Sequence, residues 1–192
     1  MRCELAAARS ELAALAARAD TDPLTELLNR RGLERELNRA LAHVKRYGAS
    51  AALVYIDLDR LKAVNDLHGH AAGDAVLKAV ANALIRHVRA SDLVARLGGD
   101  EFVVLLWHLS EADAQRKALQ LEGALDRITP VHLGTSIPVA ASTGVAALLA
   151  RDAPNDVLAR ADAAMYRRKK LRREASSGTD SPYGVVMSGG GR

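Results

Sequence analysis

Two glycines followed directly by two acids form a chemically suggestive stretch, Gly98-Gly99-Asp100-Glu101, which lies between two apolar runs. Glycine tolerates the positive φ angles that two-residue hairpin turns require, so the stretch predicts a tight β-hairpin. Such a turn would present both carboxylates on a rigid support, where they could meet a cation or a metal-bound phosphate. The same sequence also forms ordinary hairpins whose acids are merely solvated, so both interpretations stay open at this point.

A second pair of acids, Asp57 and Asp59, follows the apolar run of residues 51–56. Side chains two positions apart on a strand point to the same face, so these two carboxylates are expected to lie together. If this strand neighbours the hairpin, Asp57 and Asp100 converge and supply the oxygen ligands that suit Mg²⁺ bound to phosphates. Taken alone, the pair is more typical of acids that end a strand and cap the next helix.

The elements that must position these acids follow from the hydrophobic pattern. The chain has 192 residues, of which 49% are hydrophobic, enough for a substantial core. Thr21-Asp22-Pro23 is typical of a helix start, and we expect a helix from there to about Arg46. Further helices are expected at about residues 60–67, 71–88, 111–128 and 154–173, and strands at 51–56 and 137–145. This alternation favours an α/β or α+β sheet with helices packed on it.

The chain divides into three expected segments. In residues 1–20, Leu5, Leu12 and Leu15 have heptad spacing, which predicts the end of a longer helix that pairs with a partner helix. Residues 21–174 are expected to form the folded domain. Residues 175–192 are rich in Gly and Ser and predict a flexible tail, in which residues 183–187 could add a short edge strand.

Composition narrows the class of protein. A formal net charge of +4 and a pI of about 9.5 suit anionic ligands, but aromatics at 3% argue against a nucleic-acid-binding domain that stacks bases. Cys3 is the only cysteine, which excludes an internal disulfide and a cysteine metal site. The weakly polar stretch 137–150 is too short to span a bilayer, and the first residues lack a signal-peptide pattern. We therefore expect a cytoplasmic domain that binds a small, phosphate-rich ligand.

Several motifs together resemble the GGDEF-domain family, the diguanylate cyclases. The resemblance runs from Asp22-Pro23-Leu24-Thr25 to about Arg173. It is carried by Asp57-x-Asp59-x-x-Lys62-x-x-Asn65-Asp66-x-x-Gly69-His70-x-x-Gly73-Asp74 and by Gly98-Gly99-Asp100-Glu101-Phe102. The resemblance implies a central, mostly antiparallel sheet flanked by helices, similar to the palm of adenylate cyclases and polymerases.

The family's chemistry implies roles for the acids. The resemblance implies that two GTP molecules condense into cyclic di-GMP, with release of two pyrophosphates, and that two Mg²⁺ (or Mn²⁺) ions serve each active site. Asp57, the main-chain carbonyl of Leu58 and Asp100 would hold the metals, and Asp100 or Glu101 would accept the proton. Gly98 and Gly99 would contact the substrate. Because one domain holds one GTP, the resemblance also implies an active homodimer, with a sensory domain upstream in the full-length protein.

The substrate is expected to be read by polar residues outside the hairpin. Asn65 and Asp74 match the family's guanine readers, and a carboxylate that pairs with guanine discriminates by about 1–3 kcal/mol, by analogy with base readout in DNA. His70 matches another substrate contact, although a turn histidine bonded to the backbone is a serious alternative. Lys169 and Arg173, four apart on one helical face, match the family's phosphate-binding pair.

The last helix also departs from the family pattern. Arg172-Arg173-Glu174 stands where Gly-Arg-Asn usually follows, so the family pattern does not define the end of this helix. We expect Arg167, Arg168 and Lys170 to form only a solvated basic face. Leu61 replaces the usual Phe and should be a tolerated core exchange.

Arg89 and Asp92 stand where the family has its product-inhibition site. An arginine fork can bind guanine O6 and N7, and a carboxylate can accept the guanine N1–H, so the pair could clasp cyclic di-GMP. A routine surface ion pair is the alternative.

Two other functions remain open. A non-catalytic GGDEF module could sense GTP or cyclic di-GMP, although the intact acids argue against it. A cyclase with relaxed base choice could make an adenine-containing product, although Asp74 argues for guanine.

Overall fold

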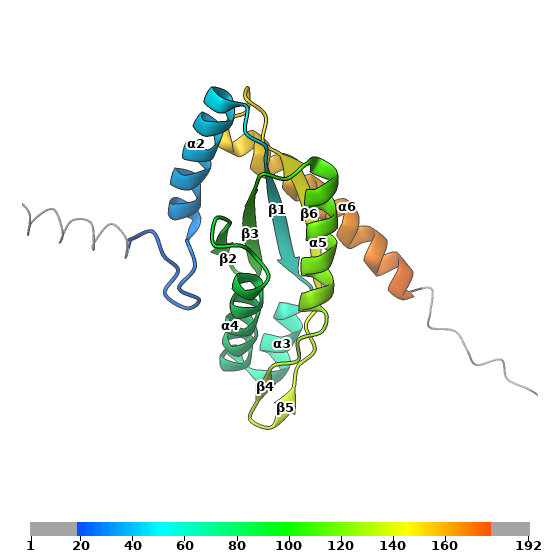
Figure 1. The fold of residues 1–192 in the computed structure, drawn as a ribbon. Coiled ribbons are helices and arrows are strands. Elements are labelled where there is room, and N and C mark those ends of the chain that lie inside the picture. Colours follow the sequence, from blue (N-terminus) through cyan, green and yellow to red (C-terminus); the bar gives the residue numbers. More distant parts are fainter. Residues whose placement is uncertain (1–18, 178–192) are drawn as a thin grey trace, which may run out of the picture.

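The computed structural model describes residues 19–177, and the fold is built on one antiparallel sheet (Figure 1). The strands of this sheet are β1 (Ala51–Leu58), β2 (Leu93–Gly98), β3 (Glu101–Trp107) and β6 (Ala141–Ala147). The helices are α2 (Arg30–Tyr47), α3 (Leu61–His68), α4 (His70–Arg86), α5 (Glu111–Leu125) and α6 (Pro154–Ser177). A small hairpin, β4 (Val131–His132) with β5 (Thr135–Ser136), extends from one end.

The strand order is β2-β3-β1-β6, and all neighbouring pairs are antiparallel. This confirms the expected mixed fold with an antiparallel sheet. β1 lies in the interior of the sheet, with Asp57 opposite Glu101 of β3 and opposite Ser142 of β6. The register therefore brings the end of the first acidic strand beside the start of the strand that follows the glycine turn.

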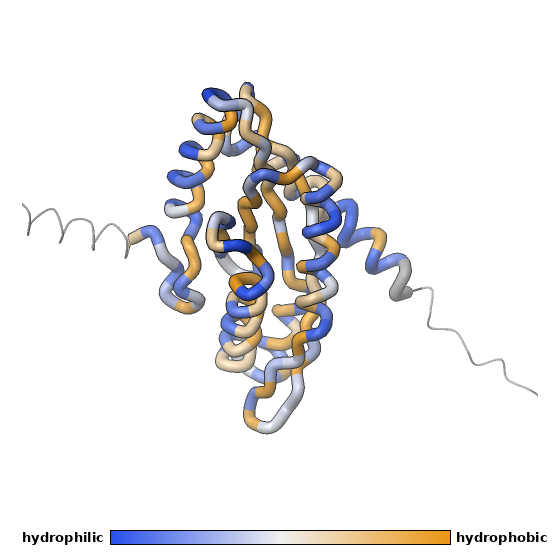
Figure 2. Tube along the Cα trace, in the orientation of Figure 1, coloured by the Kyte–Doolittle hydropathy of each residue, from blue (hydrophilic) through white to orange (hydrophobic). Residues whose placement is uncertain are grey.

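Helices cover both faces of the sheet and bury two apolar layers. α3, α4 and α5 pack on the face that carries Val54, Ile56 and Phe102. α2 and α6 pack on the opposite face, against Leu53 and Val103. Figure 2 shows mainly hydrophobic strands between helices in which hydrophobic and hydrophilic residues are mixed. Alternate residues of β1 thus enter different cores, as the period of two requires.

The expected helix start at Thr21-Asp22-Pro23 is wrong. α2 begins at Arg30, and its N-cap is Asn29, whose side chain accepts a hydrogen bond from the Gly32 amide. Asp22 instead accepts hydrogen bonds from the backbone and hydroxyl of Thr25 and closes a turn in the preceding loop. Both Asp and Asn are good caps, so local sequence alone did not decide which one starts the helix.

Other boundaries also differ from the expectation. The strand predicted at 137–145 begins only at Ala141, and residues 137–140 are irregular chain that leads into β6. The β4–β5 hairpin was not expected from the sequence. α6 continues through Ser177, beyond its expected end near Arg173. The heptad leucines and the proposed tail strand lie outside the described residues. None of the described helices is long and apolar enough to cross a membrane.

Candidate active site

The acids of β1 and of the hairpin lie next to each other at one end of the sheet. The amide of Leu58 donates a hydrogen bond to the Asp100 carbonyl at 3.1 Å, which ties β1 to the turn. Gly98 and Gly99 take φ angles of 143° and 50°, so the turn has the backbone that glycine permits. The expectation that Asp57 lies close to the hairpin acids is confirmed.

Lys169 of α6 lies between the two acids that end the first strand. Its ammonium group forms an ion pair with Asp57 and lies 3.6 Å from Asp59 Oδ1. Burial raises the pKa of Asp57; the hydrogen bond from Lys169 opposes this shift, and the negative charges of Asp100 and Asp59 add to it. One lysine therefore serves several carboxylates, and the site keeps an excess of negative charge.

Asp59 does not act as a helix cap. The N-cap of α3 is Arg60, which makes no side-chain capping bond. Asp59 Oδ2 accepts a hydrogen bond from the Ser142 hydroxyl at 3.3 Å, whereas Oδ1 is buried without a hydrogen-bond partner. A buried carboxylate oxygen without a donor is costly, so this geometry suits a site that receives a cation.

Glu101 has a neighbour that the sequence did not indicate. Burial, and then a hydrogen bond with Glu101, raise the pKa of the Tyr55 phenol far above its ordinary value. The phenol therefore stays protonated and is able to donate to the Glu101 carboxylate, and Glu101 itself lies opposite Asp57 in the strand register.

The residues present fit a divalent cation held together with phosphates. Asp57 and Asp100 offer hard oxygen atoms, the main-chain carbonyl of Leu58 lies at the same strand end, and Asp59 contributes further negative charge. The described residues hold no group of three or more His, Cys, Asp or Glu side chains placed to bind a metal ion by themselves. Mg²⁺ commonly takes one or two carboxylates and completes its shell with phosphates and water, so two carboxylates suffice.

The expected guanine readers lie on α3 and α4. Asn65 is half-buried, and its side chain lies so close to Gly73 that a Cβ built there would be 2.0 Å from Asn65 Oδ1. Asp74 follows Gly73 and is exposed, as is His70 at the start of α4. Asn65 and Asp74 are thus brought close together by the contact between the two helices.

A cleft of about 780 Å³ opens between α3, α6 and the chain before β6. Asp59 and Arg173 line it, and Arg172 lies beside them. Asp57, Asn65 and Asp74 do not line this cleft. Of the substrate-binding and metal-binding residues predicted from the sequence, Arg173 alone lines this cleft, and the guanine readers lie outside it.

The glycine turn is also connected to the loop that precedes α2, which the sequence analysis missed. Arg96 donates hydrogen bonds to the Gly99 carbonyl, the shorter at 2.8 Å, and pairs with Asp22 at 3.2 Å. The available signals were the position of Asp22 at the start of Asp22-Pro23-Leu24-Thr25 and the position of Arg96 two residues before Gly98. Each residue was visible, but their pairing over 74 positions was not.

Comparison with known proteins decides the family. The sequence model described as "Diguanylate cyclase, GGDEF domain" matches residues 19–175. The chain belongs to the GGDEF family. Diguanylate cyclase DgcP of Pseudomonas aeruginosa is 39% identical over 158 residues, which cover 82% of this chain and 23% of DgcP. Diguanylate cyclase TpbB of the same species is 41% identical over 167 residues, covering 86% of this chain and 38% of TpbB.

Solved structures of GGDEF domains have the same fold. The coiled coil and GGDEF domain of DgcB from Caulobacter crescentus, in complex with c-di-GMP, has a TM-score of 0.80 and 28% identity, covering 88% of this chain and 91% of that one. The GGDEF domain of PA1120 (TpbB or YfiN) from Pseudomonas aeruginosa has a TM-score of 0.74 and 40% identity, covering 79% and 89%. The chain spans well under half the length of the curated relatives DgcP and TpbB.

The prediction that Arg167, Arg168 and Lys170 form only a solvated basic face on α6 of this GGDEF domain is partly wrong. Arg168 donates to the buried Glu122 of α5 at 2.8 Å, and Arg172 contacts the same carboxylate at 2.5 Å. Arg168 is therefore not merely solvated. Arg167 and Lys170 are exposed, as expected.

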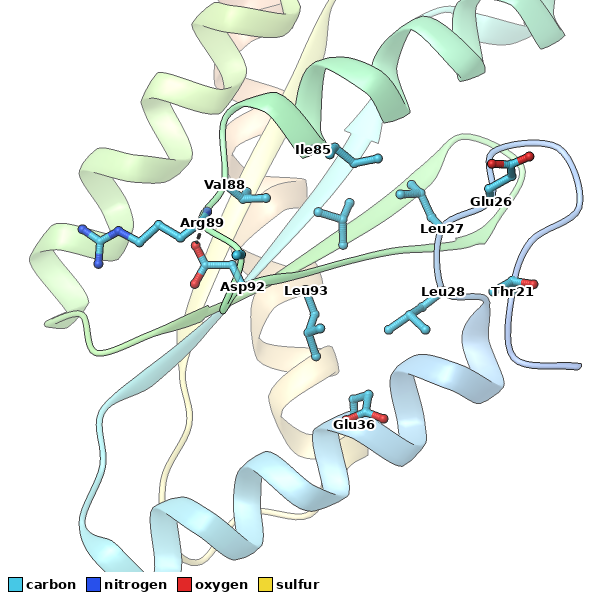
Figure 3. A pocket seen from close by; sticks show the side chains of 12 residues that line it. Thr21, Glu26, Leu27, Leu28, Glu36, Ile85, Val88, Arg89, Asp92 and Leu93 are labelled. Atoms are coloured by element: carbon cyan, nitrogen blue, oxygen red, sulfur yellow. Dashed lines mark hydrogen bonds between the residues drawn. The ribbon is translucent and has the colours of Figure 1, made fainter. Parts of the chain in front are cut away.

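In this GGDEF domain Arg89 and Asp92 line a second cavity, of about 570 Å³ (Figure 3). The Asp92 carboxylate accepts hydrogen bonds from the backbone amides of Arg89, at 3.0 Å, and Trp107, at 3.2 Å. The exposed Arg89 guanidinium extends away from the other lining side chains (Figure 3). Asp92 thus stabilises the turn through backbone amides. The bond drawn between Arg89 and Asp92 comes from the Arg89 backbone amide, so it is not the side-chain ion pair considered in the sequence analysis.

Proposed function

We propose that this domain is a diguanylate cyclase, which condenses two GTP molecules into cyclic di-GMP and two pyrophosphates. The observation that carries the proposal is the acid-rich strand end beside the glycine turn, where Lys169 contacts both Asp57 and Asp59. The negative charge of Asp100, in the turn, acts on Asp57. The relatives named as diguanylate cyclases, at 39% and 41% identity, support it.

The chemistry requires little covalent participation from the protein. The 3′-oxygen of each GTP attacks the α-phosphorus of the other, the bond to the β-phosphate oxygen breaks, and pyrophosphate leaves with the bonding electrons. Asp57, Asp100 and the Leu58 carbonyl would hold divalent cations, which neutralise phosphate charge and acidify the attacking hydroxyl when bound. Glu101, whose charge acts on the buried phenol of Tyr55, would accept the hydroxyl proton.

Lys169 would serve the phosphates once a cation occupies the acids. Its side chain is only 15% exposed and already points to the strand end, so a short movement from Asp57 transfers its charge to a bound triphosphate. Arg173, which lines the adjoining cleft, would add a second positive charge. Asn65 and Asp74 would read the guanine edge.

The reaction's symmetry implies a two-fold dimer, because each domain would present one GTP to the other. Specific activity should then rise with enzyme concentration, and polar substitution of Leu12 and Leu15 should lower it at fixed concentration by weakening helix pairing. Flat specific activity on both sides of the dimer dissociation constant would refute this mechanism.

Product inhibition is proposed at Arg89 and Asp92. The two DgcB structures from Caulobacter crescentus were solved in complex with c-di-GMP, which shows that a GGDEF neighbour binds this ligand. Here Arg89→Ala should weaken calorimetric binding of cyclic di-GMP by about 10–100-fold, because one guanine fork is lost. Arg86→Ala, which removes a nearby exposed arginine, is the control. Equal binding by both variants would reduce residues 89–92 to a structural turn.

Incubation with GTP and Mg²⁺, followed by chromatography, tests the proposed activity. Cyclic di-GMP and pyrophosphate should form in a 1:2 ratio, and ATP alone should give no cyclic product. Binding of GTP without turnover would favour the non-catalytic sensing module instead. An adenine-containing product from mixed nucleotides would favour relaxed base choice.

A further inference from the structure

The end of α6 that carries Lys169 is not held by apolar packing. Up to Met165 the helix is close to β6, since a Cβ built at Gly144 would lie 2.0 Å from the Met165 amide nitrogen. Met165 is itself buried. Beyond it, residues 166–174 include no buried side chain, and Leu171 is 60% exposed. Polar contacts must therefore fix the direction of these turns.

One acid of α5, the acid that caps its C-terminal end and two arginines of α6 provide those contacts. Glu122 is 3% exposed and accepts from Arg168 at 2.8 Å, from Arg172 at 2.5 Å and from the Thr143 hydroxyl at 3.0 Å. Arg172 also pairs with Asp126 at 2.9 Å. Glu122 and Asp126 are four residues apart, as are Arg168 and Arg172, so two matching helix faces meet. We call Glu122, Asp126, Arg168 and Arg172 the α5–α6 clasp.

The clasp joins helices from opposite faces of the sheet around its edge strand. α5 packs on one apolar layer and α6 on the other, while Thr143 belongs to β6 at the edge. The Thr143 amide also donates to Glu122, at 3.3 Å. Glu122 thus satisfies an edge-strand donor and binds both arginines, which makes it the centre of the clasp.

Lys169 lies within the helical segment that the clasp fixes. It follows Arg168 directly and precedes Arg172 by three positions, so its side chain leaves the helix at about 100° from Arg168 and about 60° from Arg172. These angles turn the ammonium group to Asp57 and Asp59 while the arginines bind Glu122. A rotation that released Glu122 would also withdraw Lys169.

We infer that Glu122 is a positioning residue, which acts through the α5–α6 clasp to hold Lys169 at the phosphate-binding end of the sheet. The inference rests on the proposed function, in which Lys169 binds the triphosphate. It also explains the chain's departure from the family pattern, because Arg172 occupies the usual glycine position and α6 continues to Ser177.

The test compares binding of 3′-deoxy-GTP and 3′-deoxy-GMP, neither of which can be cyclised, by calorimetry at fixed Mg²⁺. Glu122→Gln should lower the affinity ratio of triphosphate to monophosphate by about 10-fold, the lower end of what supporting partners of binding groups contribute. Glu122→Asp keeps the charge and should retain part of the ratio. A protein that was merely destabilised would lose affinity for both ligands alike.

A double-mutant cycle shows whether Glu122 acts through Lys169. In a Lys169→Met background, Glu122→Gln should leave the ratio unchanged. Arg160→Gln, which breaks the pair with Asp152 in the first half of α6, is the matched control and should not change the ratio. If Glu122→Gln fails to fold, Arg168→Gln tests the clasp through a side chain that is 41% exposed.

The outcomes separate this inference from the proposed function. If Lys169→Met lowers the ratio but Glu122→Gln and Arg168→Gln do not, the positioning role is wrong. The same holds if the effects of Glu122→Gln and Lys169→Met simply add. If Lys169→Met leaves the ratio unchanged, the phosphate-binding role of this lysine fails instead.

Discussion

Helix α6 binds two acidic clusters that differ in how their charges are matched. Lys169 faces Asp57 and Asp59 at the strand end, with one buried carboxylate oxygen left without a hydrogen-bond donor. In the α5–α6 clasp, Arg168 and Arg172 meet two carboxylates, and Glu122 receives further hydrogen bonds from Thr143. The first cluster has too few positive charges, and the second is balanced.

The pKa directions follow this difference. Burial raises the pKa of Asp57, and one lysine does not compensate. Burial also acts to raise the pKa of Glu122, but hydrogen bonds from Arg168, Arg172 and Thr143 overcome it and hold the pKa below its ordinary value. The strand-end acids therefore lack enough positive partners and could bind a cation, whereas Glu122 of the clasp already has its hydrogen-bond donors. A buried carboxylate that lacks hydrogen-bond donors or positive partners is suited to bind a ligand, whereas one whose partners are complete is a structural contact.

The largest expected effect breaks the first cluster. Asp57→Asn should lower cyclic di-GMP formation by at least about 100-fold, because it removes a proposed metal ligand. The substitution should leave the midpoint of thermal unfolding equal or higher, because it removes the Asp57 charge, whose burial opposes folding. Asp100→Ala should likewise abolish activity. Near-normal turnover by Asp57→Asn would show that the charge excess is not used in catalysis.

Breaking the second cluster should give the opposite result for stability. Glu122→Ala should lower the free energy of unfolding by about 1–3 kcal/mol, because buried donors lose their acceptor while the partly exposed arginines regain water. Urea denaturation of Glu122→Ala and Asp57→Asn in parallel measures the contrast. A loss of the same size in both variants would erase the distinction between the clusters.

Acidification should reveal opposite signs. Because the folded pKa of Glu122 is lowered, its stabilisation is complete above the ordinary glutamate value of about 4.3 and is lost as the pH falls through the lower folded value. The raised pKa of Asp57 has the reverse sign, so its charge opposes folding at neutral pH and ceases to do so in acid. At neutral pH we expect Glu122→Gln to be less stable than the wild type and Asp57→Asn to be equally or more stable. Both differences in the free energy of unfolding should shrink towards zero near pH 3.

Local signals predicted the first cluster better than the second. The glycine turn and the alternation of β1 predicted where these acids lie within their own elements, because both signals depend on neighbouring residues. That Asp57 meets the hairpin was predicted only on the condition that the two strands are neighbours, and the β1–β3 pairing meets that condition. The pairing of Glu122 with Arg168 depends on two helices meeting around a strand edge, and nothing within either helix indicated it. The predicted start of α2 was wrong for another reason. Asp22 and Asn29 are both competent caps, but Asp22 is engaged by Thr25 in a turn and by Arg96 in an ion pair.

The smallest expected effect lies within the first cluster. Asp59→Asn should change the free energy of unfolding by less than about 1 kcal/mol, because Ser142 supplies only one hydrogen bond, at 3.3 Å, to this carboxylate. Removing its charge should lower the pKa of Asp57, since Asp59 is one of the charges that raise it. Titration of the Asp57 carboxyl by NMR in the wild type and in Asp59→Asn measures the shift, with Ser142→Ala as a control that keeps the charge. An unchanged or higher Asp57 pKa in Asp59→Asn would mean that Lys169 already neutralises both acids, and the charge excess that separates the two clusters would not exist.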